Sequence, residues 1–394
     1  MEVVIERLDD FGRGIAYIDD KICFVENALV GEKVDIKIIS EHSKFLEAKV
    51  LKYIDKSQDR IEVKCPYYDI CGGCNLCHLK YKEENKFKLE KVKNVFKKFS
   101  NIDIDITDIK SSNEYNYRNK IILHGDNKSL GLYSNKTHNI VDIKSCLLCS
   151  STINQIIKKI RKIGISGIKN VLIRVSNDDK NSILNISGDI DINKYNNISN
   201  VLIYNGKLIS NDSSIISNIG EKKYYLSTNS FFQVNRLLVD DLYKEVKDNI
   251  IGTKILDLYC GTGSIGIYID SNNITGIDNN TSNIHDANRN LELNNISGEF
   301  YLADVEDIID RFDNFDTVIV DPPRSGLDKE TISNLMRINS KRIIYVSCEP
   351  ITLVRDLALM TDKYEVSKVK VFNMFPRTYH CESVTILCRK TIEK

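Results

Sequence analysis

The sequence predicts an α/β protein built from three parts, and two patterns along its 394 residues carry that prediction. From residue 254 onward, apolar strand-like stretches alternate with helical stretches, which predicts a mostly parallel sheet with helices on both faces. From residue 1 to about 55, five short alternating strands separated by turn residues predict a small OB-like β-barrel. We therefore expect a barrel at 1–55, a central α+β domain at 56–230 and a last domain at 231–394.

The expected barrel strands carry glycine punctuation and no helical period. They read "EVVIERL", "GRGIAYID", "KICFVEN", "EKVDIKII" and "FLEAKVLKYI". A cysteine cluster follows, and a lysine-rich amphipathic helix is expected around residues 79–99. Mixed strands then continue to about residue 225. They include a hairpin in "KIILHGDNKSLGLYS" that turns at Gly125-Asp126-Asn127.

A helix near residues 234–249 leads into the last domain, where seven strands are expected. They read "KILDLYC", "NITGID", "EFYLAD", "DTVIVDPP", "RIIYVSC", "VSKVKVFNMF" and "SVTILCR". The last two lack an intervening helix, so we expect them to pair antiparallel. This pattern predicts a Rossmann-like, seven-stranded sheet with an antiparallel last strand.

The composition is typical of a soluble protein, with 42% hydrophobic and 28% charged residues. No apolar run approaches the ~20 residues of a membrane span. The start "MEVVIERLDD" is unlike a secretory signal, and the odd number of 11 cysteines favours thiols or metal ligands over a disulfide scaffold. We expect a cytoplasmic protein that acts as a monomer.

The neutral net charge hides an asymmetry along the chain. Residues 231–340 hold 9 Lys and Arg against 19 Asp and Glu, so this segment carries −10 and the remainder carries +10. A partner made of phosphate groups is therefore expected to meet the N-terminal part and the last segment of the chain.

A glycine loop follows the first strand of the last domain. "DLYCGTGSIG" places Gly261, Gly263 and Gly266 in a G-x-G-x-x-G pattern that opens a helix, and Asp278 ends the next strand. Such a loop lets a ligand approach the backbone, and the helix N-terminus favours an anion. By itself the loop fits a nicotinamide or flavin dinucleotide as well as S-adenosylmethionine (SAM).

The later strand ends favour SAM. Asp257, Asp278, Asp321 and Cys348 all fall at carboxyl ends of strands, where ligands of open α/β sheets bind. These carboxylates suit the sulfonium cation of SAM and would repel a pyrophosphate. "DPPR" places Arg324 where methyltransferases that act on amino groups carry an aromatic residue, which argues against methylation of an exocyclic amine.

A cysteine beside a SAM site indicates methylation of a pyrimidine carbon. A thiolate that adds to carbon 6 makes carbon 5 nucleophilic enough to take a methyl group, after which a base removes the carbon-5 proton. Cys348 would be the nucleophile, with a pKa lowered from about 8.5. Glu382 in "FPRTYHCESV" would be the base, and His380 a supporting group.

Five motifs together carry a resemblance to a known family. "SFFQVN", "DLYCGTG", "DPPRSGL", "YVSCEPITLVRDL" and "MFPRTYHCESV" resemble the signature set of the bacterial RNA uracil-5-methyltransferases. The resemblance implies a SAM-dependent methyltransferase domain in which Cys348 is the nucleophile and Glu382 the base. It also implies the SAM contacts Gln233, Tyr259, Asp278 and Asp321.

Two positions depart from the family pattern. Ser264 stands where members often have Asn, and Asp278 where Glu is usual; both keep a polar group, so we expect altered reach and retained SAM binding. Asp304 in "FYLADVED" is a further candidate for contact with SAM.

Cysteines in two separate segments indicate a metal site. "CPYYDICGGCNLC" holds Cys65, Cys71, Cys74 and Cys77, and "DIKSCLLCS" adds a distant pair. The paired spacing is compatible with zinc, but the gap between the segments exceeds that of a zinc ribbon. Iron–sulfur clusters tolerate such a distant fourth ligand.

The C-x5-C-G-G-C spacing resembles the ribosomal-RNA branch of the same family, whose members carry a [4Fe-4S] cluster. The resemblance implies Cys65, Cys71, Cys74 and Cys146 as its ligands. Cys77 stands where the family more often has Gln, and Cys149 is likewise additional. The N-terminal barrel resembles a TRAM domain, an RNA-binding module.

These observations favour SAM-dependent methylation of carbon 5 of a uridine in RNA, with 23S ribosomal RNA preferred over transfer RNA. Tyr115, Tyr117 and Arg118 are candidates for contact with bases, although tyrosines in strands mostly pack. Two other classes stay open: an iron–sulfur NAD(P)-dependent oxidoreductase, and an RNA chaperone without catalysis. Cytosine-5 methylation is disfavoured because Cys348 lacks a preceding proline or a second cysteine nearby.

Overall fold

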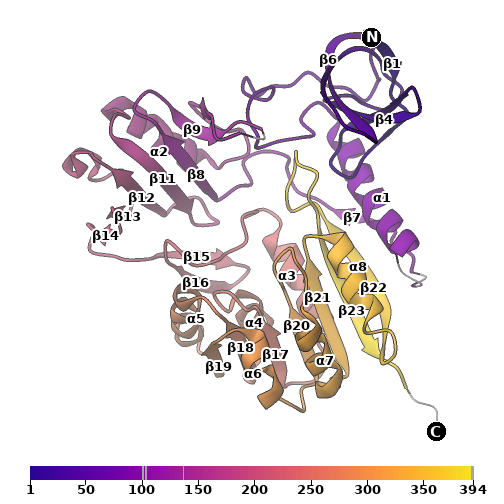
Figure 1. The fold of residues 1–394 in the computed structure, drawn as a ribbon. Helices are drawn as coiled ribbons and strands as arrows, with labels where there is room; N and C mark the ends of the chain where they lie inside the picture. The colour runs from indigo at the N-terminus through magenta and orange to yellow at the C-terminus, as the bar shows by residue number, and fades with distance from the viewer. Residues whose placement is uncertain (100–101, 103, 136, 392–394) are drawn as a thin grey trace.

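The structure is a computed structural model, and it describes residues 1–99, 102, 104–135 and 137–391. The chain forms three sheets and one separate two-stranded hairpin (Figure 1). Within the described residues, no helix is both long and apolar enough to cross a membrane.

The first sheet has six strands and rolls around a core of its own (Figure 1). Its order is β1-β5-β6-β4-β3-β2, with β4 and β6 parallel and the other neighbours antiparallel. The strands are β1 (Glu2–Val4), β2 (Arg7–Leu8), β3 (Gly14–Ile18), β4 (Lys21–Glu26), β5 (Lys33–Glu41) and β6 (Phe45–Asp55). The first of the five expected segments is split into β1 and β2, and the other four each form one strand.

The second sheet has seven strands in the order β10-β9-β8-β11-β12-β13-β14. Its elements are β8 (Lys120–Gly125), β9 (Leu130–Tyr133), β10 (Ile140–Asp142), α2 (Ser151–Ile163), β11 (Ile168–Val175), β12 (Ser182–Gly188), η1 (Ile192–Tyr195), β13 (Val201–Tyr204) and β14 (Lys207–Leu208). Four isoleucines of α2 are buried in a shared core with this sheet. The expected hairpin is present as β8 and β9, and its turn runs through residues 126–129.

The third sheet has eight strands in the order β19-β18-β17-β20-β21-β23-β22-β7. Its strands are β7 (Ile109–Lys110), β17 (Ile255–Leu258), β18 (Ile274–Asp278), β19 (Gly298–Leu302), β20 (Thr317–Val320), β21 (Arg342–Ser347), β22 (Tyr364–Phe372) and β23 (Glu382–Arg389). β17 to β21 are parallel, and β23 pairs antiparallel with both β21 and β22, as expected. The eighth strand, β7, comes from far earlier in the chain and was not expected.

Helices cover both faces of this sheet because alternate strand residues are buried on opposite sides. One face packs against the hairpin β15 (Ile215–Ile219) and β16 (Lys222–Leu226) and against α3 (Val239–Asp248), α4 (Ser264–Ile269) and α5 (Thr281–Leu293). The other face packs against α1 (Tyr81–Phe99), α6 (Val305–Ile308), η2 (Ile309–Arg311), α7 (Lys329–Ile338) and α8 (Pro350–Ala358). The expected helix at 234–249 begins only at Val239.

The lysine-rich helix α1 belongs to the last sheet although it precedes the second sheet in sequence. Val92, Val95 and Phe96 lie in the same core as α7 and α8, and Lys88 is completely buried. The helix therefore buries Lys88, and also Lys91, with its apolar stripe. Sequence alone did not indicate this, because lysine usually stays in solvent.

Candidate active site

Antiparallel pairing brings Cys348 and Glu382 together. Ser347, the last residue of β21, is paired with Ser383 of β23, so the next position on each strand places Cys348 beside Glu382. Glu382 opens β23 and is 3% exposed, whereas Cys348 is partly exposed. A thiol that a substrate can reach thus lies next to a buried carboxyl group.

Three carboxyl groups at this edge of the sheet have raised pKa values. Burial, followed by repulsion from Asp321, raises the pKa of Asp257 to about 8. Burial raises the pKa of Asp321 to about 7. Burial and then Asp321 also raise the pKa of Glu382 well above its usual range. Because one of these charges disfavours the next, the group is poised to take up a cation or a proton.

The thiol of Cys348 does not have the lowered pKa that was expected. Burial first, and then the charges of Glu382 and Asp321, raise its pKa to about 12, while Arg324 counteracts them. The expectation is wrong for the protein without its substrate, because a carboxylate neighbourhood destabilises a thiolate. Arg324 is the nearby cation that opposes this effect.

His380 stands beside Arg324 and is held in its neutral form. Arg324 Nη2 lies 3.3 Å from His380 Nε2. Burial, and then the charge of Arg324, lower the pKa of His380 to about 4. At neutral pH the ring can therefore accept a hydrogen bond from the guanidinium, which fixes the direction of the arginine side chain.

A hydrogen bond to Asp278 holds the glycine loop in place. The N–H of Gly261 donates to Asp278 Oδ2 at 2.9 Å, and the other oxygen accepts from Asn280 N and Asn283 Nδ2 at 2.9 and 2.8 Å. Gly263 has φ +69°, and a Cβ there would lie 2.6 Å from the Phe300 ring. Both the backbone conformation and the close approach of the ring require glycine at this position.

A cavity of about 460 Å³ opens beside this loop, at the carboxyl ends of the parallel strands. Tyr259, Asp278 and Asp304, three of the residues predicted to contact SAM, line it. Asn279 and Arg355 line it as well; Asn279 Nδ2 donates to Asp304 Oδ1 at 2.6 Å. Its size and place suit a small ligand at the ligand edge of an open α/β sheet.

Other expected SAM contacts lie outside the lining of this cavity. Ser264 is buried, and its hydroxyl is bonded to Tyr243 Oη at 2.7 Å. Gln233 is also buried, and its backbone carbonyl accepts from Asn119 Nδ2 at 2.9 Å. Asp321 also lies outside the lining, but its charge acts on the neighbouring groups, because it raises the pKa values of Asp257, Glu382 and Cys348.

The sequence placed Asp257 among the carboxylates that suit SAM, and it gave no role to Arg355. Asp257 is fully buried, its Oδ2 accepts from Gly266 N at 3.2 Å, and its Oδ1 has no hydrogen-bond partner. An orphaned carboxylate oxygen next to the glycine loop is consistent with a ligand that supplies positive charge or a donor. Nothing in the sequence indicated that Arg355, on α8, lines the cavity, because its position in the pattern is that of an ordinary solvent-facing helix residue.

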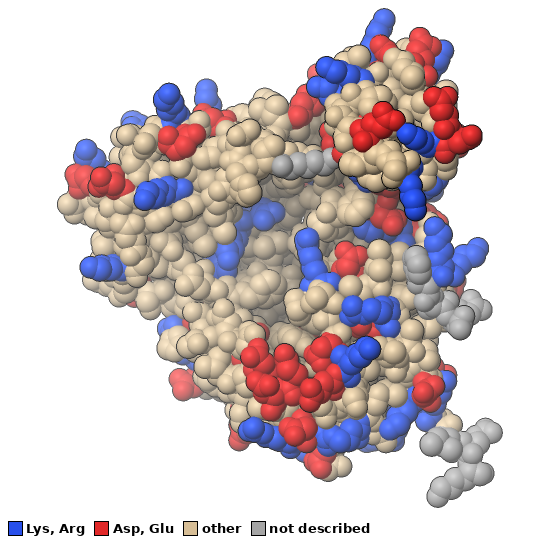
Figure 2. Space-filling view, viewed as in Figure 1, with Lys and Arg blue, Asp and Glu red and all other residues tan. Residues whose placement is uncertain are grey.

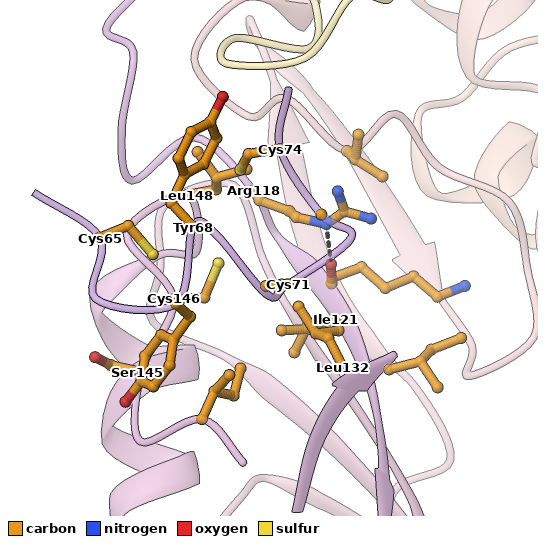
Figure 3. Close-up of a pocket in the computed structure, with 16 residues that line it drawn as sticks. Cys65, Tyr68, Cys71, Cys74, Arg118, Ile121, Leu132, Ser145, Cys146 and Leu148 are labelled. Carbon is orange, nitrogen blue, oxygen red and sulfur yellow. Dashed lines mark hydrogen bonds between the residues drawn. The ribbon is translucent and has the colours of Figure 1, made fainter. Parts of the chain in front are cut away.

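A second cavity, of about 410 Å³, is lined by Cys65, Cys71, Cys74 and Cys146 (Figure 3). These are the four cysteines that the resemblance implied as ligands, and both segments that carry them meet here. Arg118 and apolar residues such as Leu132 complete the lining. Cys77 and Cys149 are buried and lie outside the lining.

The cysteine side chains face one cavity without closing around a metal ion. Within the described part of the chain, no group of three or more His, Cys, Asp or Glu side chains has the arrangement of a metal site. The donor set nevertheless suits a soft metal, because four thiol groups share the cavity with mostly apolar neighbours.

The tyrosines expected near RNA bases are used for packing or for contacts within the protein. Tyr117 is completely buried and its hydroxyl donates to Pro376 O at 3.1 Å. Tyr115 places its ring 5.6 Å from the guanidinium of Arg377.

On the face in Figure 2, Asp and Glu side chains gather over the lower part that holds β17 to β20, while Lys and Arg side chains border the central hollow.

Comparison with known families identifies three matches along the chain. A TRAM domain model matches residues 1–51, a methyltransferase small domain model matches residues 226–342, and a tRNA (uracil-5-)-methyltransferase model matches residues 299–390. The TRAM match lies on the first sheet, and the other two lie on the third sheet and its helices, after the hairpin β15–β16.

Relatives match the chain over nearly its whole length. An uncharacterised RNA methyltransferase of Clostridium acetobutylicum is 32% identical over 446 residues, covering 98% of this chain and 96% of that protein. One of Aquifex aeolicus is 31% identical and covers 98% of each. The structure of Pyrococcus abyssi tRNA (uracil-54, C5)-methyltransferase with S-adenosyl-L-homocysteine has a TM-score of 0.83 and 26% identity, covering 98% of this chain and 99% of that one.

Proposed function

The chain belongs to the RNA uracil-5-methyltransferase family and is a SAM-dependent RNA methyltransferase, and on that premise we propose that it methylates carbon 5 of a uridine through a covalent bond to Cys348. The observation that carries the proposal is the pairing of β21 with β23. It brings Cys348 beside Glu382 at the edge of the sheet that holds the glycine loop.

In the proposed reaction, the sulfur of Cys348 bonds to carbon 6 of the uracil and turns carbon 5 into a nucleophile. Carbon 5 attacks the methyl carbon of SAM, and the bond from that carbon to the sulfonium breaks. Glu382 takes the carbon-5 proton, the Cys348–carbon 6 bond breaks and the ring double bond returns. The target base has to leave its stack to reach a buried site of this kind.

The raised pKa values of Cys348 and Glu382 indicate what each residue and its neighbours would do in the reaction. Cys348 has to lose its proton before attack, and Arg324 is the cation that favours the thiolate. Glu382 takes up a proton readily because burial and Asp321 raise its pKa, which suits a base that must accept one from carbon. Neutral His380 directs Arg324 toward this site.

We propose Tyr259, Asp278 and Asp304 as direct SAM contacts, and Gly261 and Gly263 as the loop that lets SAM approach. They line the 460 Å³ cavity or form its glycine loop. Asp321 is proposed to favour the sulfonium by its charge. Ser264 and Gln233 are buried and lie outside the lining of this cavity, which makes them the weaker candidates.

We also propose that the cysteine-lined cavity holds a [4Fe-4S] cluster bound by Cys65, Cys71, Cys74 and Cys146. A cavity of about 410 Å³ is larger than a single ion requires, since one water molecule takes about 30 Å³ of liquid volume. Arg118 and Lys120 line the cavity and suit the negative charge of a thiolate-bound cluster. The cluster would cross-link the two segments and make no direct contact with the methylated base.

For the RNA, we propose 23S ribosomal RNA as the first candidate substrate and transfer RNA as the second. The N-terminal TRAM domain and the cysteine-lined cavity favoured ribosomal RNA. The second candidate is supported by the Pyrococcus abyssi enzyme, whose name specifies tRNA and which matches 98% of this chain.

The division of the chain into domains at 1–55, 56–230 and 231–394 is likewise a proposal. It is qualified by α1 and β7, which lie within 56–230 but contribute to the third sheet.

The test combines labelling with two variants. The purified protein is incubated with tritiated SAM and unmodified ribosomal or transfer RNA, and the labelled nucleotide is mapped. Cys348→Ala is expected to abolish labelling and adduct formation, whereas Glu382→Gln is expected to accumulate a methylated protein–RNA adduct. Labelling by Cys348→Ala at the wild-type rate would overturn the covalent mechanism.

A further inference from the structure

The segment that leads to Glu382 is held by the segment that carries the cysteines. We name residues 373–381, between β22 and β23, the catalytic loop, and residues 71–77 the cysteine loop. The carbonyl oxygen of Arg377 in the catalytic loop accepts hydrogen bonds from Asn75 N at 2.9 Å and Leu76 N at 3.1 Å. These two amides follow directly after Cys74, which lines the cysteine cavity.

The side chain of Arg377 continues this connection from a buried position. The residue is 1% exposed, and its Nη1 donates to Leu76 O at 3.3 Å and Leu79 O at 2.7 Å. Its Nη2 is paired with Glu114. The guanidinium therefore satisfies carbonyls on both sides of Cys77, which lysine with its single ammonium group cannot reproduce.

Helix α1 fixes the catalytic loop from the opposite side. Glu84 Oε1 accepts from the backbone N–H of Arg377 at 2.9 Å and from Lys88 Nζ at 2.8 Å. Lys88 Nζ also donates to Asn373 Oδ1 at 2.6 Å and to Phe375 O at 3.0 Å. Glu84 and Lys88 are both fully buried, so these bonds hold the beginning and the middle of the loop in one arrangement.

The backbone of Arg377 depends on these contacts. Its φ is +69°, in the left-handed region that residues other than glycine, asparagine and aspartate rarely adopt. Such a conformation persists only where surrounding contacts impose it. Loosening the cysteine loop would remove two backbone hydrogen bonds and the carbonyl acceptor of Leu76 at once. The strained residue, five positions before Glu382, would then be free to relax.

We propose that Arg377 is a positioning residue through which the cysteine loop controls the placement of Glu382. When the cysteine loop is ordered, Arg377 holds the catalytic loop so that Glu382 faces the carbon-5 proton. When the cysteine loop is loosened, the proton abstraction slows while Cys348, on the separate strand β21, still attacks the base. This inference rests on the proposed roles of Cys348 and Glu382.

The chemical test separates the two steps in a single turnover. Arg377→Lys retains the charge, and Arg377→Gly removes the side chain while relieving the backbone strain. In both variants we expect release of methylated RNA from the adduct to slow by about tenfold or more, as for a misplaced catalytic group, with adduct formation within about threefold of the wild type. Equal slowing of both steps, or unchanged release, would overturn the proposal.

Arg342→Gln is the matched control for this experiment. Arg342 lies at the opposite end of β21 and also donates from its guanidinium to a backbone carbonyl, Asn249 O, at 2.9 Å. We expect it to leave the ratio of the two steps unchanged. Cys348→Ala and Glu382→Gln run in parallel: adduct formation by Cys348→Ala refutes the proposed function itself, independently of Arg377.

Hydrogen exchange tests the coupling without reference to chemistry. Cys74→Ser is expected to raise the exchange rate of amides 378–383 by about tenfold in the wild-type background, and by less than about twofold when Arg377→Gly is already present. Cys23→Ser, a buried cysteine of the first sheet, is the control and should leave these amides unchanged. An equal effect of Cys74→Ser in both backgrounds would overturn the coupling through Arg377.

Discussion

Two clusters of mostly buried charged groups, one that includes Arg377 of the catalytic loop and one that includes Glu382 directly after it, are built differently. The clamp cluster consists of Glu84, Lys88, Arg377 and Glu114, in which each charge has an opposite partner. The carboxylate cluster consists of Asp257, Asp321 and Glu382, whose pKa values are all raised. The first is neutral as a group, whereas the second gathers like charges around one nearby cation, Arg324.

The clamp cluster therefore stabilises the folded structure, whereas the carboxylate cluster favours the binding of a cation. Paired and hydrogen-bonded buried charges fix geometry, and removing one partner leaves the other without compensation. Like charges brought together by the fold destabilise one another and gain from a cation that arrives later. The sulfonium of SAM is such a cation, so the unfavourable cluster is consistent with a binding site.

The largest effect is expected from breaking the clamp cluster. Lys88→Ala removes one of the two cations that pair with buried Glu84 and leaves Arg377 at 3.5 Å, so it should lower the free energy of unfolding by about 3 kcal/mol. Denaturant unfolding measures this loss. The double variant Glu84→Gln/Lys88→Met should recover part of the loss, and a double variant as unstable as the sum of the two single variants would contradict the pairing.

The carboxylate cluster should respond in the opposite way. Asp321→Asn removes one of its repelling charges, so we expect unchanged or increased stability together with SAM binding weakened by about tenfold, or about 1.4 kcal/mol. Calorimetric titration with SAM measures the affinity. Asp313→Asn, an exposed carboxylate of the same part of the chain, is the control, and equal SAM affinity in Asp321→Asn and wild type would remove Asp321 from the site.

The pH dependence of adduct formation tests the effect of the cluster on Cys348. Its thiolate is the reactive form, and the pKa is raised to about 12, so the thiolate fraction should rise by about tenfold per pH unit between pH 7 and 9. The rate of adduct formation in a single turnover of the wild-type protein, which keeps the charge of Glu382, is expected to follow it. A rate that stays constant over this range would mean that bound RNA or SAM lowers the pKa of the thiol.

The smallest effect is the change of stability with pH. Asp257 has a folded-state pKa of about 8, above the ordinary value of 3.8, so its contribution is fully present below pH 3.8 and is lost as the pH rises toward 8. Asp257→Asn should flatten the fall of unfolding free energy between pH 5 and 7 by about 1 kcal/mol per pH unit. Parallel pH curves for the two proteins would show that Asp257 ionises normally in the folded state.

Much of the last sheet was readable from sequence because its strands are buried on both faces and read as continuous apolar runs. The position of Cys348 was readable for a related reason, since it ends such a run just before Glu349 and Pro350, which open a helix. The local signals of strand, turn and helix start agree at this point, and the expected antiparallel pair β22–β23 followed from the absence of a helix between its strands.

Contacts between distant segments could not be read in the same way. Arg377 and Lys88 are charged residues that sequence patterns place in solvent, yet both are buried. The guanidinium of Arg377 pairs with Glu84, 293 positions earlier in the chain. Lys88 pairs with Glu84 on its own helix and donates to Asn373, 285 positions later. The raised pKa of Cys348 was missed for the same reason, because it depends on carboxylates brought together by separate strands. No local pattern records such neighbours.

The two-residue strand β7 has a consequence for how the catalytic part can be inherited or transplanted. It lies beside β22 at the margin of the third sheet, while Val92, Val95 and Phe96 of α1 cover the adjoining core. A fragment starting at residue 231 would expose unpaired backbone amides of β22 at that margin. It would also expose the apolar surface that α1 covers, and both features promote self-association. Recombination that moves this catalytic part to another protein must therefore carry residues 81–110 along with it.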